Sequence, residues 1–198
     1  MLKTKDPVLL HCCCAPCAGG ILERLVEAGT KVTVFFYNPN IHPRGEYELR
    51  KDQLIKFCQK KHISFIDADY DAENWFDMMR GKEHLPERSE RCSLCFDMRL
   101  TKTADYAAKN GFSLIATTLS VSRWKDAMQV NLSGKKAEVP GVTFWDYDWR
   151  QNNGEQLSSM VAKKEGFYRQ EYCGCLFSLR EANEARRDKG KEIIVRDV

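Results

Sequence analysis

Residues 7–40, "PVLLHCCCAPCAGGILERLVEAGTKVTVFFYNPN", decide the fold of this chain. A short apolar run leads into a cysteine-rich loop. Residues 18–29 then have the apolar spacing of an amphipathic helix that Gly29 ends, and residues 31–37 are rich in β-branched and aromatic side chains, as strands are. Because a strand, a helix and a second strand in this order pair in parallel through a right-handed crossover, the stretch predicts a βαβ unit.

The rest of the chain continues this alternation. We expect helices over residues 45–62, 72–110 (interrupted near 81–92) and 154–166, and strands within 63–70, 111–122 and 142–149. The pattern predicts an α/β fold with a Rossmann-like, doubly wound, mostly parallel sheet and helices on both faces. We expect one domain over residues 1–198, with a charged peripheral segment from about 180–198.

Composition narrows the class of protein. The 198 residues are 43% hydrophobic and 30% charged, which suits a globular domain with a real core. The net charge of +3 permits a nucleic-acid partner without indicating one. We see neither a signal peptide nor a run long enough to span a membrane, so we expect a cytoplasmic protein. In that reducing compartment, nine cysteines indicate metal or redox chemistry rather than structural disulfides.

The first cysteine group occupies the loop after the first strand and contains Cys12, Cys13, Cys14 and Cys17. This loop often binds phosphate in Rossmann-like folds, but here it has neither the G-x-G-x-x-G spacing nor a P-loop lysine. The positive end of the following helix favours thiolates. Since ligands of doubly wound folds bind beyond the C-terminal ends of the strands, this loop is the expected active site.

Two further cysteine pairs follow. Cys92 and Cys95 form a C-x-x-C pair, predicted to lie on a helical segment, which could bind a metal or act as a redox dithiol. Cys173 and Cys175 flank a glycine and could close a small, easily reduced disulfide ring, or supply two more metal ligands. The remaining cysteine, Cys58, is predicted to be a small core residue.

The number and softness of these ligands indicate the kind of metal site. Four thiolates from an adjacent pair and a C-x-x-C suit an iron–sulfur cluster or zinc. Adjacent cysteines chelate a single zinc ion awkwardly, whereas neighbouring thiolates could bind different irons of a cubane. We therefore expect a [4Fe–4S] cluster rather than zinc.

Polar residues follow the other strands. The loop after the second strand offers candidates for substrate binding, namely Asn38, Asn40, His42, Glu46 and Arg50. Asp67, Asp69 and Asp71 could supply an oxygen ligand or a general acid, or could cap a helix. Residues 117–125 carry hydroxyls, Arg123 and Lys125 for phosphate contacts. His11 ends the first strand, where a hydrogen-bonding role is the most frequent one.

Five stretches together resemble the cobalamin-independent epoxyqueuosine reductase family of the QueH type. They are "HCCCAPC" (11–17), "YNPNIHPRGEYELR" (37–50), "RCSLCFDMRL" (91–100), "ATTLSVSRWKD" (116–126) and "EGFYRQEYCGCLFS" (165–178). The resemblance covers about residues 7–180, in the family's order. Cys12 stands at a variable position of the family motif, and Arg123 replaces a proline.

The resemblance implies a function and a set of site residues. The activity would be the two-electron reduction of the epoxide of epoxyqueuosine in tRNA to give queuosine, with electrons from an external donor protein. The implied [4Fe–4S] ligands are Cys13, Cys14, Cys92 and Cys95, and the implied redox-active disulfide joins Cys173 and Cys175. A further mononuclear iron is implied as well, with Cys17, Asp69 and Asp71 as candidate ligands.

Two other classes compete with this interpretation. An iron–sulfur-dependent tRNA sulfur-transfer enzyme of the ATP-pyrophosphatase type would share the sheet, but it needs a glycine- and serine-rich pyrophosphate loop where this chain has cysteines. A zinc or redox-sensing binding module would explain one cysteine pair and not eight thiols in three groups.

Overall fold

The computed structural model describes residues 4–122 and 125–195, so Arg123 lies outside the described residues. Strands and helices alternate along them. In chain order the elements are β1 (Val8–His11), α1 (Ala15–Glu27), β2 (Val32–Phe36), α2 (Arg44–Lys60), β3 (Ser64–Asp67), α3 (Ala72–Met79), α4 (Glu90–Lys109), β4 (Leu114–Thr117), the 3-10 helix η1 (Leu119–Val121), α5 (Ala127–Lys136), β5 (Thr143–Phe144), α6 (Gly154–Lys164) and α7 (Leu176–Arg187).

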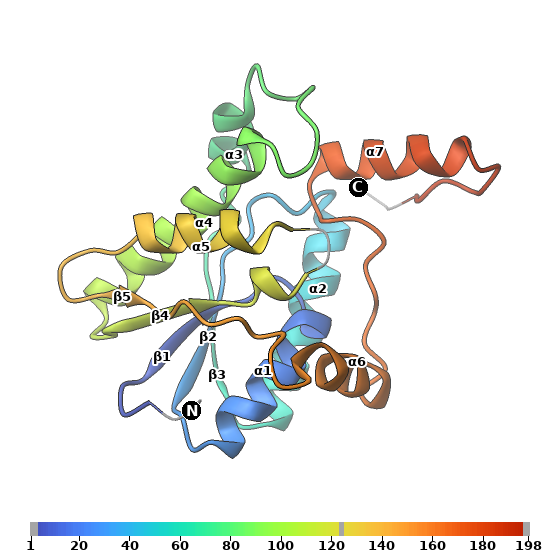
Figure 1. The fold of residues 1–198 in the computed structure, drawn as a ribbon. Helices are drawn as coiled ribbons and strands as arrows, with labels where there is room; N and C mark the ends of the chain where they lie inside the picture. The colour runs from blue at the N-terminus through green and yellow to red at the C-terminus, as the bar shows by residue number, and fades with distance from the viewer. Residues whose placement is uncertain (1–3, 123–124, 196–198) are drawn as a thin grey trace.

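The strands form one sheet in the order β3-β2-β1-β4-β5, and each pairing within it is parallel (Figure 1). β1 lies at the centre, fully buried, between β2 and β4. The strand order reverses between β1 and β4, which is where doubly wound folds bind their ligands. The predicted fold class is confirmed.

Helices cover both faces of the sheet (Figure 1). Val8 and Leu10 of β1 point to one face and pack with side chains of α1, α2 and α6. Leu9 points to the other face and packs with Leu100 and Ala104 of α4. The alternation of side chains along a strand therefore divides one apolar run between two cores.

Helix α1 begins inside the cysteine loop, three residues earlier than the spacing predicts. Cys14 occupies the N-cap position with extended backbone, so Cys17 lies in the first turn of the helix. Two glycines then face α6: a Cβ placed on Gly20 would lie 2.7 Å from the backbone nitrogen of Ser158. Because only glycine leaves this space, α1 and α6 pack closely and α6 lies beside the cysteine loop.

The structure differs from the expected elements in two places. The strand expected within 142–149 is confined to Thr143–Phe144, and α5 has no counterpart in the prediction. Asp126 is the N-cap residue of α5, and its carboxylate accepts a hydrogen bond from the backbone N–H of Gln129. Its apolar residues Met128 and Leu132 are exposed, so the sequence lacks the amphipathic stripe that identifies a helix. In residues 4–122 and 125–195, no helix has the length and hydrophobicity needed to cross a bilayer.

Candidate metal and redox site

The site lies at the C-terminal edge of β1, where the strand order reverses. The sulfur atoms of Cys13, Cys14 and Cys17 all lie within 4.8 Å of one another, and those of Cys13 and Cys14 are 3.7 Å apart. Cys13 and Cys14 are buried and Cys17 is half-buried. Cys12 packs instead into the core on the α1 side of the sheet, together with Cys58, which confirms the core role predicted for Cys58.

Hydrogen bonds within this group lower the pKa of one thiol and raise that of another. Bonds with Cys14 and Cys17 lower the pKa of Cys13 well below its usual value, and the positive charges of Lys125 and Arg99 lower it further. The bond with Cys13 conversely raises the pKa of Cys14 to about 12. The lowered pKa of Cys13 favours its thiolate form, which is the form that binds a soft metal.

Lys125 supplies a buried positive charge to the site. The residue is only 8% exposed. Burial disfavours its charged form, but the nearby sulfurs of Cys173, Cys13 and Cys17 outweigh that effect and raise the pKa of Lys125. The sequence indicates Lys125 as a candidate for phosphate contacts. In the structure its positive charge instead interacts with the thiols of the site.

The C-x-x-C pair lies at the start of α4, as predicted. Cys92 packs against the cluster that contains Cys13 and Cys14, and its sulfur accepts a hydrogen bond from the backbone N–H of Arg88 at 3.3 Å. Cys95 is buried in a neighbouring cluster with Trp75 and Cys175. The pair therefore lies between the first cysteine group and the last.

The Cys173–Gly174–Cys175 segment completes the site from the C-terminal side. Gly174 has φ +133°, a conformation that side-chain-bearing residues rarely adopt, so the glycine is needed as predicted. Cys175 precedes α7, and its sulfur accepts a hydrogen bond from the backbone N–H of Ser178. Burial, followed by the neighbouring Cys173, raises the pKa of Cys175 to about 12. All nine cysteines lie among the described residues and are free thiols.

Buried residues of α2 hold this segment in place. Figure 1 shows the chain running from α6 past α2 to the start of α7. Arg50 donates a hydrogen bond to the carbonyl of Cys173 at 3.0 Å and forms an ion pair of 2.7 Å with Glu46, both side chains being almost fully buried. The backbone N–H of His42 donates to the carbonyl of Gly174 at 2.8 Å. The sequence offered these three residues as substrate ligands, but here they position the loop.

The carboxylates proposed for a further iron lie elsewhere. Across the described residues, no group of three or more metal-binding atoms within 4.8 Å includes Asp69 or Asp71. Asp71 immediately precedes α3, and its carboxylate accepts hydrogen bonds from Tyr37 at 3.3 Å and Asn74 at 2.7 Å. Asp69 is exposed. The ligand set with Cys17 stays a prediction.

His11 has the hydrogen-bonding role that its position at the strand end predicted. Its Nδ1 lies 2.9 Å from the hydroxyl of Thr117, and its Nε2 lies 3.1 Å from the carbonyl of Tyr37. Burial lowers the pKa of His11 to about 3, so the ring is neutral and ties β1 to β4 and to the loop after β2.

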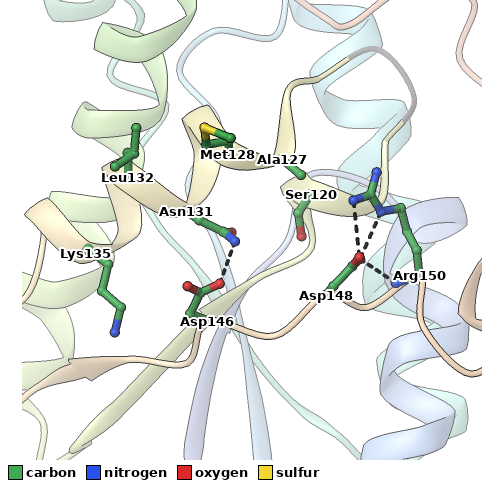
Figure 2. Close-up of a pocket in the computed structure, with 9 residues that line it drawn as sticks. All are labelled: Ser120, Ala127, Met128, Asn131, Leu132, Lys135, Asp146, Asp148 and Arg150. Carbon is green, nitrogen blue, oxygen red and sulfur yellow. Dashed lines mark hydrogen bonds and ion pairs between the residues drawn. The ribbon is translucent and has the colours of Figure 1, made fainter.

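A separate pocket of about 520 Å³ lies between α5 and residues 146–150 (Figure 2). Figure 2 shows Asn131 bonded to Asp146 and Arg150 paired with Asp148 on its walls. None of the nine residues that line it is a cysteine.

Known proteins show where this arrangement belongs. The model of the epoxyqueuosine reductase QueH family matches residues 8–181. Epoxyqueuosine reductase QueH of Haemophilus influenzae is 49% identical over 191 residues, which cover 96% of this chain and 78% of that protein. The chain belongs to the epoxyqueuosine reductase QueH family. Family members of Acinetobacter baylyi and Thermotoga maritima are 47% and 35% identical to this chain, and the aligned residues cover 88% and 95% of those two proteins. The QueH family is therefore a family of oxidoreductases.

A solved structure shares the fold. It is the U34-tRNA thiolase NcsA from Methanococcus maripaludis with its [4Fe-4S] cluster, at a TM-score of 0.57 and 13% identity, covering 94% of this chain and 67% of that one. This likeness concerns the fold.

Proposed function

We propose that this chain is an epoxyqueuosine reductase that removes the epoxide oxygen from epoxyqueuosine in tRNA, in the cytoplasm. One observation carries the proposal: in a chain of the QueH family, three cysteine groups that are far apart in the sequence meet at the ligand-binding edge of the sheet. A structural zinc needs four ligands at most, and this edge gathers more thiols than that.

The donor set fits a [4Fe–4S] cluster held by Cys13, Cys14, Cys92 and Cys95. The adjacent thiols, the lowered pKa of Cys13 and the contact with Cys92 support this assignment. The structurally similar thiolase carries a [4Fe-4S] cluster, which also supports it. A bound cluster would supply single-electron transfer. Because four thiolates leave no open position on its four irons, a Lewis-acidic iron would have to be the additional mononuclear one. Lys125 would offset part of the negative charge of the thiolates.

The Cys173–Cys175 pair would supply the reducing equivalents. Converting an epoxide into an alkene and water takes two electrons and two protons. A dithiol that closes to a disulfide releases two electrons and two protons. A dithiol protein from outside would then reduce the disulfide again. The raised pKa of Cys175 keeps its proton in place at neutral pH.

The proposal also includes an additional mononuclear iron. Cys17 lies beside Cys13 and Cys14, which supports a role for its thiol at the site. Asp69 and Asp71 would have to approach it, and the hydrogen bonds of Asp71 to Tyr37 and Asn74 would have to open first.

Anaerobic purification followed by iron and sulfide analysis tests the cluster. We expect about four acid-labile sulfides and about five irons per chain, four irons in the cluster and one at the additional site; zinc without sulfide would refute both the cluster and the reductase. Cys173→Ser should stop turnover and leave the visible absorption of the cluster intact, and loss of that absorption would make Cys173 a ligand. Cys58→Ala is the matched control, because this thiol is buried in the core away from the site.

The same preparation tests the sulfur-transfer alternative. Such an enzyme splits ATP to pyrophosphate when it activates tRNA, so incubation with ATP and tRNA should release no pyrophosphate if the chain is a reductase. Release of pyrophosphate in step with tRNA thiolation would replace the proposed function.

A further inference from the structure

A groove of about 330 Å³, with both apolar and polar residues in its walls, opens at the edge of the cysteine site, between the first turn of α1 and α6. Cys17 and Gln170 both line it. The Nε2 of Gln170 also donates a hydrogen bond to the sulfur of Cys14 at 3.3 Å. The groove therefore connects the protein surface with the thiols of the site.

The outer wall of this groove has the chemistry that binds a nucleic-acid backbone. Arg169 is exposed, and one of its N–H groups donates to the hydroxyl of Ser159 at 3.2 Å. The buried Ser158 lines the groove one position earlier on α6. A guanidinium carries five donors and binds phosphate through paired hydrogen bonds, and serine hydroxyls add contacts to phosphate and ribose oxygens.

Close packing of two helices holds this wall in place. A Cβ on Gly19 would lie 2.9 Å from Val161, and one on Gly20 would lie 2.7 Å from both the backbone nitrogen and the hydroxyl of Ser158. These contacts fix α6 against the helix that carries Cys17. A site whose walls are set before the ligand arrives loses less entropy on binding.

We propose that this groove binds the modified nucleotide of the tRNA, with Arg169 on a backbone phosphate and the modified base directed toward Cys17. The proposal rests on the proposed function, since it takes the RNA substrate from there. Arg169 and Gln170 are adjacent in the chain, so one short segment joins the phosphate contact to the sulfur of Cys14. Glu155, an exposed residue of the same groove, would repel a phosphate placed beside it and so favours the position beside Arg169.

RNA binding tests the phosphate contact. The probe is a fluorescently labelled anticodon stem-loop with guanosine at the wobble position, titrated by anisotropy from about 50 to about 200 mM salt. Arg169→Gln should weaken binding about tenfold at low salt and reduce the slope of log K against log salt by about 0.7, the value for one phosphate contact to a single strand. Arg80→Gln is the matched control, because Arg80 is an exposed arginine at the end of α3. Equal affinities and slopes for the wild type and Arg169→Gln would overturn the proposal.

Filling the groove tests where the base goes. Ser159→Trp places a large side chain on an exposed position of the wall, so we expect kcat/KM for epoxyqueuosine-containing tRNA to fall at least tenfold with iron and sulfide contents unchanged. Wild-type turnover by Ser159→Trp would overturn the groove as the site. If the cluster-loaded wild type bound RNA in the Arg169-dependent way and yet reduced no epoxide, the proposed function would fail and the groove would stand.

Discussion

Replacing Arg50 with methionine should destabilise the protein strongly and release the Cys173–Gly174–Cys175 loop. Arg50 and Glu46 form an ion pair in which the side chains are 1% and 0% exposed. Removing one member of a buried pair leaves the other charge without compensation, which costs about 3–5 kcal/mol. Arg50 also donates to the carbonyl of Cys173 at 3.0 Å, and a hydrogen bond from a charged group contributes about 1.5–3 kcal/mol. Since such terms are not additive, we expect a total of about 5 kcal/mol.

Urea unfolding followed by tryptophan fluorescence measures this loss. A loss of this size is comparable to the whole stability of many domains, so a second variant is needed. The double variant Glu46→Gln, Arg50→Met removes both charges and keeps an acceptor for the hydroxyl of Tyr168, which donates to Glu46 at 3.1 Å. We expect the double variant to be at least about 2 kcal/mol more stable than Arg50→Met alone. If the double variant were no more stable than Arg50→Met alone, the account of the pair as a compensated buried charge would be wrong.

Two other perturbations address acid stability and redox tuning. Burial lowers the pKa of His42 from 6.5 to about 4. As the pH falls, this histidine therefore takes up a proton in the unfolded chain before it does so in the folded protein. The free energy of unfolding is at its full value above pH 6.5 and decreases toward pH 4. Between pH 7.5 and 5 His42 should contribute a loss of about 2 kcal/mol in urea unfolding, in addition to a similar loss from the buried His11. His42→Phe should therefore lose about 2 kcal/mol less than the wild type over this range, whereas the exposed-site control His62→Gln should behave like the wild type; equal pH dependence in wild type and His42→Phe would contradict this. Gln170→Glu replaces an N–H donor to Cys14 by a negative charge. In protein that holds the proposed [4Fe–4S] cluster, the midpoint potential of the cluster should therefore fall by about 60 mV or more in a spectroelectrochemical titration. The control Gln156→Glu makes the same charge change on the exposed side of α6, and an equal shift in both variants would exclude a specific role for the Cys14 contact.

Local sequence patterns predict most of this fold because its strands and early helices have clear periodicities. The rule that loops meet at the C-terminal edge of parallel strands also located the cysteine loop correctly. α5 was missed because its apolar residues Met128 and Leu132 face solvent. Packing against the rest of the fold, and not an amphipathic sequence pattern, makes such a segment helical.

The supporting residues of the site were harder to predict. Glu46 and Arg50 are four residues apart on a helix, a spacing typical of solvated surface pairs. Their burial depends on the segment around Cys173, which lies far along the chain and packs over them. Lys125 likewise stands as one lysine in a polar stretch, and only the fold brings it to the thiols. Contacts of this kind are set by tertiary structure, and no short window of sequence contains them.

Because three cysteine segments that are distant in the sequence meet in one site, metal binding affects how stable the protein is after synthesis. A metal group bound to both Cys13 and Cys92 would act as a cross-link between remote parts of the chain, and ligands that bind only the folded state stabilise it. Chains that never acquire iron would lack this cross-link, so they would unfold more often and would be cleaved by proteases more often. The abundance of the enzyme would then follow the iron supply of the cell, without any dedicated sensor.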